Sequence, residues 1–121
     1  MKAPLTIRMA SLAVAGVAAT ALAPQLSASA ERQFLYCVSS AAAPGGKAYF
    51  SHVYPGTWDQ SADDEEGFYR HVSQRVDEGV ERGTTYCYAL DTFDEAGLDR
   101  AEGIEVVRKG GWDPVDITWR P

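Results

Sequence analysis

TTYCYALDTFDE, residues 84–95, decides how this chain folds. Its first half is dominated by β-branched and aromatic residues around Cys87, a composition typical of a strand. Thr92 and Glu95 then have the spacing of a capping box, in which a threonine hydroxyl and a glutamate carboxylate bond to free amides at the start of a helix. This stretch predicts a strand over 84–90 that turns directly into a helix.

The helix that Thr92 caps is predicted to end at the glycine pair at 110–111. Helical spacing puts five residues on its inner stripe, namely Phe93, Ala96, Arg100, Ile104 and Val107. An arginine in such a place lays its methylene groups on the core and extends its charge to a carboxylate. We therefore expect Arg100 to form a structural ion pair with Asp91 or Asp116.

Three more strands are predicted on either side of this central unit. Residues 34–40 and 47–54 are rich in β-forming residues and are separated by an Ala-Pro-Gly stretch, which indicates a β-hairpin. Residues 114–119 (PVDITW) alternate between apolar and polar side chains, which indicates a closing strand.

Residues 61–78 form the other predicted helix. Ser61 is expected to be its N-cap, and Phe68, Val72 and Val76 recur at helical spacing. The four consecutive acidic residues at 63–66 point around such a helix instead of converging on a metal ion. Their charges favour the positive end of the helix dipole, so a capping role is expected for them.

Cys37 and Cys87, the only two cysteines, are expected to form a structural disulfide in an oxidising compartment. The alternative is a pair of buried free thiols. A disulfide would bring the first and third strands together, so we expect the first strand to lie between the second and the third. The predicted fold is α+β with the order ββαβαβ, a two-layer sandwich with both helices on one face of a four-stranded mixed sheet.

The first 30 residues have the pattern of a signal peptide. Lys2 and Arg8 precede an apolar run over 9–23, and small residues at 28–30 suit cleavage before Glu31. A retained membrane anchor is the alternative, but the run is short and interrupted. We expect residues 31–121 to form one domain, released to the periplasm or the medium without a membrane anchor.

The charge of this domain limits its partners. The whole chain carries a formal charge of −6, and loss of Lys2 and Arg8 with the signal peptide would lower it to −8. Such a charge repels nucleic acids and anionic membrane surfaces. We therefore expect no nucleic-acid partner.

Three segments, 87–90, 92–100 and 115–121, resemble small exported bacterial proteins and domains of uncharacterised function. The resemblance spans most of the chain after residue 31 and implies a compact α+β module with one helix layer. It implies no catalytic residue. A similarity to septal peptidoglycan-binding domains lies in architecture alone, and their elements follow a different order.

Motifs for catalysis or metal binding are absent from the sequence. Ser51 and His52 are neighbours on a predicted strand, so their side chains point to opposite faces and cannot cooperate as nucleophile and base. His52 and His71 are the only histidines, and they do not have the helical spacing of metal ligands. We assign no catalytic residue, no metal ligand and no cofactor.

Aromatic residues in predicted loops give the strongest functional signal. Tyr54 and Trp58 flank the Pro-Gly pair at 55–56, and Trp112 follows the glycine pair at 110–111. These side chains either fold back on the domain or form a surface that stacks on a sugar or contacts a protein. We expect a non-enzymatic exported module that binds a protein or an envelope glycan through Tyr54, Trp58 and Trp112. The alternative is a small secreted hydrolase or a hydrolase inhibitor.

Overall fold

The computed structural model describes residues 32–121, and the predicted signal peptide lies outside the described residues. The elements are, in chain order, the strands and helices β2 (Gln33–Ala41), β3 (Lys47–Ser51), β4 (Tyr54–Gly56), the 3-10 helix η1 (Trp58–Gln60), α2 (Ser61–Arg75), β5 (Val80–Leu90), α3 (Phe93–Lys109) and β6 (Asp113–Ile117). The predicted α+β class is confirmed. No helix within 32–121 combines the length and apolar character needed to span a membrane.

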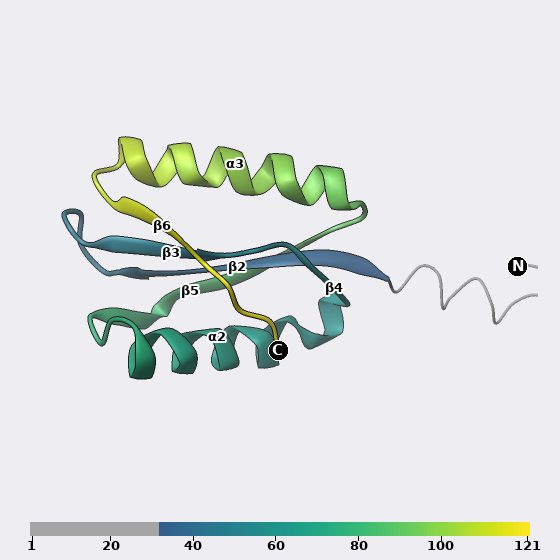
Figure 1. Ribbon diagram of the computed structural model, residues 1–121, viewed down its shortest axis with the longest axis horizontal. Coiled ribbons are helices and arrows are strands. Elements are labelled where there is room, and N and C mark those ends of the chain that lie inside the picture. The colour runs from purple at the N-terminus through teal and green to yellow at the C-terminus, as the bar shows by residue number, and fades with distance from the viewer. Residues whose placement is uncertain (1–31) are drawn as a thin grey trace, which may run out of the picture. The chain divides into compact units, whose positions relative to one another are not determined.

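β2 is the central strand of one curled mixed sheet (Figure 1). β5 pairs with one edge of β2, while β3 and β4 pair with the other, all of them antiparallel to β2. β6 extends the sheet by pairing in parallel with β3. The prediction that the first strand lies between the second and the third is therefore confirmed.

The second predicted strand, 47–54, is interrupted and becomes β3 and β4. Val38 lies opposite Phe50 and Leu35 lies opposite Tyr54, so this side of the ladder holds one more residue than β2 does. Such a β-bulge leaves a backbone group without its ladder partner. The buried Ser51 Oγ takes that place and accepts a hydrogen bond from the Cys37 amide at 2.8 Å.

The two helices lie on opposite faces of the sheet, with α3 above it and α2 below it in Figure 1. The expected two-layer arrangement, with both helices on one face, is therefore wrong. Because β4, β5 and β6 all run in the same direction, α2 carries the chain across the sheet from β4 to β5, and α3 carries it back from β5 to β6. Right-handed connections that travel in opposite directions across one sheet place their helices on opposite faces.

Each helix packs on its own hydrophobic core. The core under α2 contains the disulfide and is made of Leu35, Cys37, Tyr49, Tyr54, Phe68, Val72, Val80 and Cys87. The core under α3 is smaller and is made of Tyr36, Ala48 and Phe50, with Val38, Ile104, Val107 and Trp112 packed around them. The predicted disulfide is present, and the structure contains no free cysteine among the residues it describes.

Several local boundaries differ from the sequence-based expectation. Gln60 is the N-cap of α2, and Ser61 is already inside the helix, because η1 leads the chain into it with helical backbone angles. Phe93 was expected on the inner stripe of α3 but is 59% exposed and meets Phe34 edge to face. The cap of α3 is confirmed, since the Thr92 hydroxyl accepts a hydrogen bond from the Glu95 amide.

Candidate functional site

The structure does not bring the three aromatic residues singled out in the sequence onto one surface. Tyr54 is only 3% exposed and belongs to the core under α2. Trp112 packs against the core on the opposite face, and its indole N–H donates to the Ala41 carbonyl at 2.9 Å. Trp58 alone is mostly exposed, at 57%. Two of the three side chains have therefore folded back on the domain.

Tyr54 forms part of a buried polar network beside the disulfide. Its hydroxyl donates to Asp64 Oδ2 at 2.8 Å and lies 3.4 Å from Cys37 Sγ. Burial, followed by the bond to Asp64, raises the pKa of Tyr54. Burial also raises the pKa of Asp64, although the bond from Tyr54 opposes that change. This network fixes the start of α2 to the sheet.

Arg100 forms the structural ion pair expected for an arginine on an inner stripe, and of its two predicted partners it chooses Asp116. Its guanidinium lies 2.6 Å from Asp116 Oδ1 and donates to the Ser51 carbonyl at 2.7 Å. These bonds tie α3 to β6 and to the end of β3. The guanidinium is thus engaged within the fold.

β5 is an edge strand, and α2 covers one of its faces, which we call the covered side. Within this cover Glu65 Oε2 accepts a hydrogen bond from the Cys87 amide at 3.0 Å. Because the Cys37 amide donates to Ser51, the pair Cys37 and Cys87 exchanges no backbone bonds, and Cys87 turns its amide to the free edge. Glu65 therefore occupies the middle of that edge.

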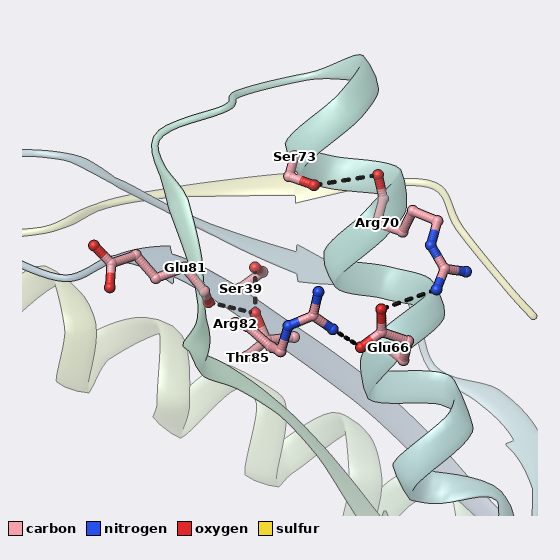
Figure 2. Close-up of polar contacts among 7 residues, drawn as sticks. All are labelled: Ser39, Glu66, Arg70, Ser73, Glu81, Arg82 and Thr85. Carbon is pink, nitrogen blue, oxygen red and sulfur yellow. Dashed lines mark hydrogen bonds and ion pairs between the residues drawn. The ribbon is translucent and has the colours of Figure 1, made fainter.

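Ion pairs reinforce the same cover (Figure 2). Glu66 on α2 contacts both Arg70, one helical turn away, and Arg82 on β5. The guanidinium of Arg82 also lies over the ring of Tyr69, 4.5 Å from its centre. The carboxylates of Glu65 and Glu66 are thus both used to hold α2 against β5.

Among the residues that the structure describes, none forms such a cover over the other face of β5, which we call the open side. Tyr86 is 50% exposed and Tyr88 is 42% exposed on this face. Tyr88 stacks on the buried ring of Tyr36 with 5.2 Å between the ring centres. Tyr36 in turn donates to Asp99 Oδ2 on α3 at 2.6 Å, which anchors the floor of the open side to the helix.

A row of carboxylates borders the open side, and we call it the acidic row: Asp91, Glu95, Asp99 and Glu102. With Ala89, Leu90 and the exposed Leu98, these residues line a hollow of about 490 Å³. Partial burial, and to a lesser extent Tyr86, Asp99 and Glu65, raises the pKa of Tyr88. Within 32–121, no member of the acidic row has an ion-pair partner.

Sequence reasoning missed this arrangement, although its signals are visible. Tyr86 and Tyr88 are two residues apart on a strand and so share a face, and the spacing of Glu95, Asp99 and Glu102 puts them on one side of a helix. What the sequence does not show is that α3 leaves that face of β5 uncovered.

Within residues 32–121, the cysteines and histidines form no thiol nucleophile or metal centre beside this surface. Both cysteines are in the disulfide, so neither thiol can act as a nucleophile. His52 follows β3 and His71 lies on α2, and no cluster of three metal-ligating side chains occurs in the described part of the chain. Comparison with protein-family models, curated proteins and solved structures gives no match to this chain.

Proposed function

We propose that this chain is an exported binding module that holds a protein or another envelope component at the open side of β5 and catalyses no reaction on it. The observation that carries the proposal is the exposure of Tyr86 and Tyr88 on one face of β5, together with the exposed Leu98 in the hollow that the end of the same strand lines. Half-exposed aromatic side chains beside an apolar one are typical of binding surfaces, since tyrosine combines a large apolar ring with a polar tip.

The disulfide supports the same role. Cys87 lies between Tyr86 and Tyr88 in β5 and is tied across the ladder to Cys37 on the central strand. The two tyrosines are therefore presented from a strand whose backbone is anchored to the central strand at the residue between them. A surface that is already rigid loses less conformational entropy when a partner binds.

Export is the other part of the proposal. The signal-peptide pattern of residues 1–30 supports it, and the disulfide suits an oxidising compartment such as the periplasm or the medium. Mass spectrometry of the protein recovered from cells that express the full chain tests this point. Cleavage before Glu31 is expected, and recovery of the intact chain from the cytoplasm would contradict export.

Crosslinking capture from the native envelope tests the binding surface. Three forms are compared: the wild type, the double variant Tyr86→Ser with Tyr88→Ser, and Trp58→Ser. The last is the matched control, because Trp58 is an exposed aromatic residue elsewhere on the domain. One captured protein or glycan should be lost with the tyrosine variant and kept with the control. Loss with Trp58→Ser alone would move the site to the loop around η1, and capture that ignores all three residues would reject the surface.

A further inference from the structure

We propose that the open side of β5 takes an extended, positively charged peptide segment of a partner protein, which lies between the acidic row and the tyrosines. This inference rests on the proposed binding function and names the chemistry of its partner. It concerns a surface that combines an uncovered sheet face, a hollow about 490 Å³ in volume and an unpaired row of carboxylates.

Charge is the first argument for this occupant. Glu66, Glu105, Asp113 and Asp116 each contact a lysine or arginine of the chain itself. In residues 32–121 the acidic row has no such contact, so its charges face the hollow uncompensated. Complementary charge determines which partner a surface selects and how fast it binds, and here the complementary side chains are lysine and arginine.

Spacing is the second argument. Glu95 and Asp99 are four residues apart on α3, which separates them by about 6 Å along the helix axis. Tyr86 and Tyr88 are two residues apart on β5, which separates them by about 6.7 Å along the strand. In an extended peptide, side chains on one face also recur about every 6.7 Å. An extended segment can therefore place successive cationic side chains along the acidic row while its body rests on the tyrosines.

The free edge of β5 argues that the segment lies on the face of the strand. Adding a strand to this edge would require the outward amide of Cys87, which Glu65 already binds. Recognition on the face of the strand needs no backbone pairing. It uses the side chains of the acidic row and of the two tyrosines. A second copy of the chain fits poorly, because it would bring another acidic row to the same place. A neutral glycan would leave the carboxylates unpaired.

A displayed library of random twelve-residue peptides tests the inference, with the oxidised protein made from its full chain as the bait. Four forms are compared: the wild type, Glu95→Gln with Glu102→Gln, the matched control Glu78→Gln with Glu81→Gln, and Tyr86→Ser with Tyr88→Ser. Both glutamine pairs remove two exposed charges and keep side-chain shape. An N-acetylglucosamine oligomer and sedimentation of the protein alone are the additional probes.

We expect the selected peptides to carry lysine or arginine at every second position. Their affinity should fall about tenfold when Glu95 and Glu102 are neutralised and less than about twofold in the matched control, as expected for a few exposed charge pairs. The tyrosine variant should also weaken binding, and added salt should weaken it further.

Other outcomes separate this inference from the proposed function. Suppose that neutral peptides or the sugar oligomer bind through the tyrosines, and that neutralising Glu95 and Glu102 has no effect. This result would overturn the inference of a cationic partner and would keep the proposed binding surface. If the wild type is a dimer and the tyrosine variant is a monomer, the occupant of the open side is a second copy of the chain and not a peptide. If no probe binds in a way that depends on the tyrosines, both the cationic partner and the proposed binding function are overturned.

Discussion

The two sides of β5 differ in how they use carboxylates. On the covered side, Asp64, Glu65 and Glu66 each have a partner within the fold: a buried tyrosine, a backbone amide and two arginines, respectively. On the open side, Asp99 accepts a hydrogen bond from one hydroxyl, and no member of the acidic row has an ion pair with another residue of 32–121. Apart from Asp91, which precedes α3, both sets of carboxylates lie on α-helices that contact β5, so acidic composition alone does not distinguish them.

The difference shows that a helix beside a strand can either pack on the strand and cover it or border the strand and leave its face exposed. α2 is held against β5 through its side chains, and the carboxylate of Glu65 satisfies a backbone amide that would otherwise be free at the sheet edge. α3 packs over the centre of the sheet and passes the open side at a distance that leaves two tyrosines accessible. Substitutions on the covered side should therefore alter stability, and those on the open side should alter binding.

Removal of the disulfide should have the largest effect on stability. Cys37 and Cys87 close a loop of about 50 residues, and the loss of that restraint in the unfolded chain is worth about 4 kcal/mol. Urea unfolding of Cys37→Ala with Cys87→Ala, against the oxidised wild type, measures the change in the free energy of unfolding. A loss below about 1 kcal/mol would mean that the packing on the covered side holds β5 without the covalent bond.

Phe68→Ala and Leu98→Ala compare the two helices directly. Phe68 on α2 is fully buried in the core that holds the disulfide, so its truncation should cost about 3 kcal/mol. Leu98 on α3 is 70% exposed, and its truncation should change stability by less than about 0.5 kcal/mol. Equal losses in the two thermal or urea transitions would show that the open side is part of a core.

Glu65→Ala should have an intermediate effect. The Cys87 amide would lose its acceptor at a partly buried site, at a cost of about 1 to 2 kcal/mol. Glu65→Gln retains an acceptor and should recover most of that loss, while Glu102→Ala on the open side should be close to neutral, since Glu102 is exposed in the interior of α3. Sedimentation should also show that Glu65→Ala self-associates, since the edge of β5 becomes free for pairing. A monomeric, fully stable Glu65→Ala protein would reject the role of Glu65 at the edge.

The pH dependence of Asp64 should give the smallest effect. Burial raises its pKa in the folded state, so this group favours the folded state most at low pH and loses that contribution as the pH rises through its folded pKa. Asp64→Asn keeps an acceptor for Tyr54 and has no charge to bury. The variant should gain stability relative to the wild type as the pH increases from 3 to 7. A relative gain toward low pH would mean that the bond from Tyr54 outweighs burial.

Much of the local structure could be predicted from the sequence, and the functional surface could not. The capping box at Thr92, the disulfide and the central place of the first strand all follow from short-range chemistry or from a covalent restraint. The aromatic residues near chain turns did not indicate an exposed surface, because Tyr54 and Trp112 pack in two separate cores. Exposure depends on what packs against a residue, and local sequence contains little information about that.

The sequence by itself determined the two long helices and most of the strands of this protein, its pairing of cysteines and the ion-pair role of Arg100. These features depend on residues close along the chain or on a small number of available partners. Only the tertiary structure decided that the helices lie on opposite faces, because this follows from where β6 joins the sheet. The same choice places α3 over the centre of the sheet and leaves Tyr86 and Tyr88 on β5 uncovered, since one helix cannot cover all four strand positions of the sheet.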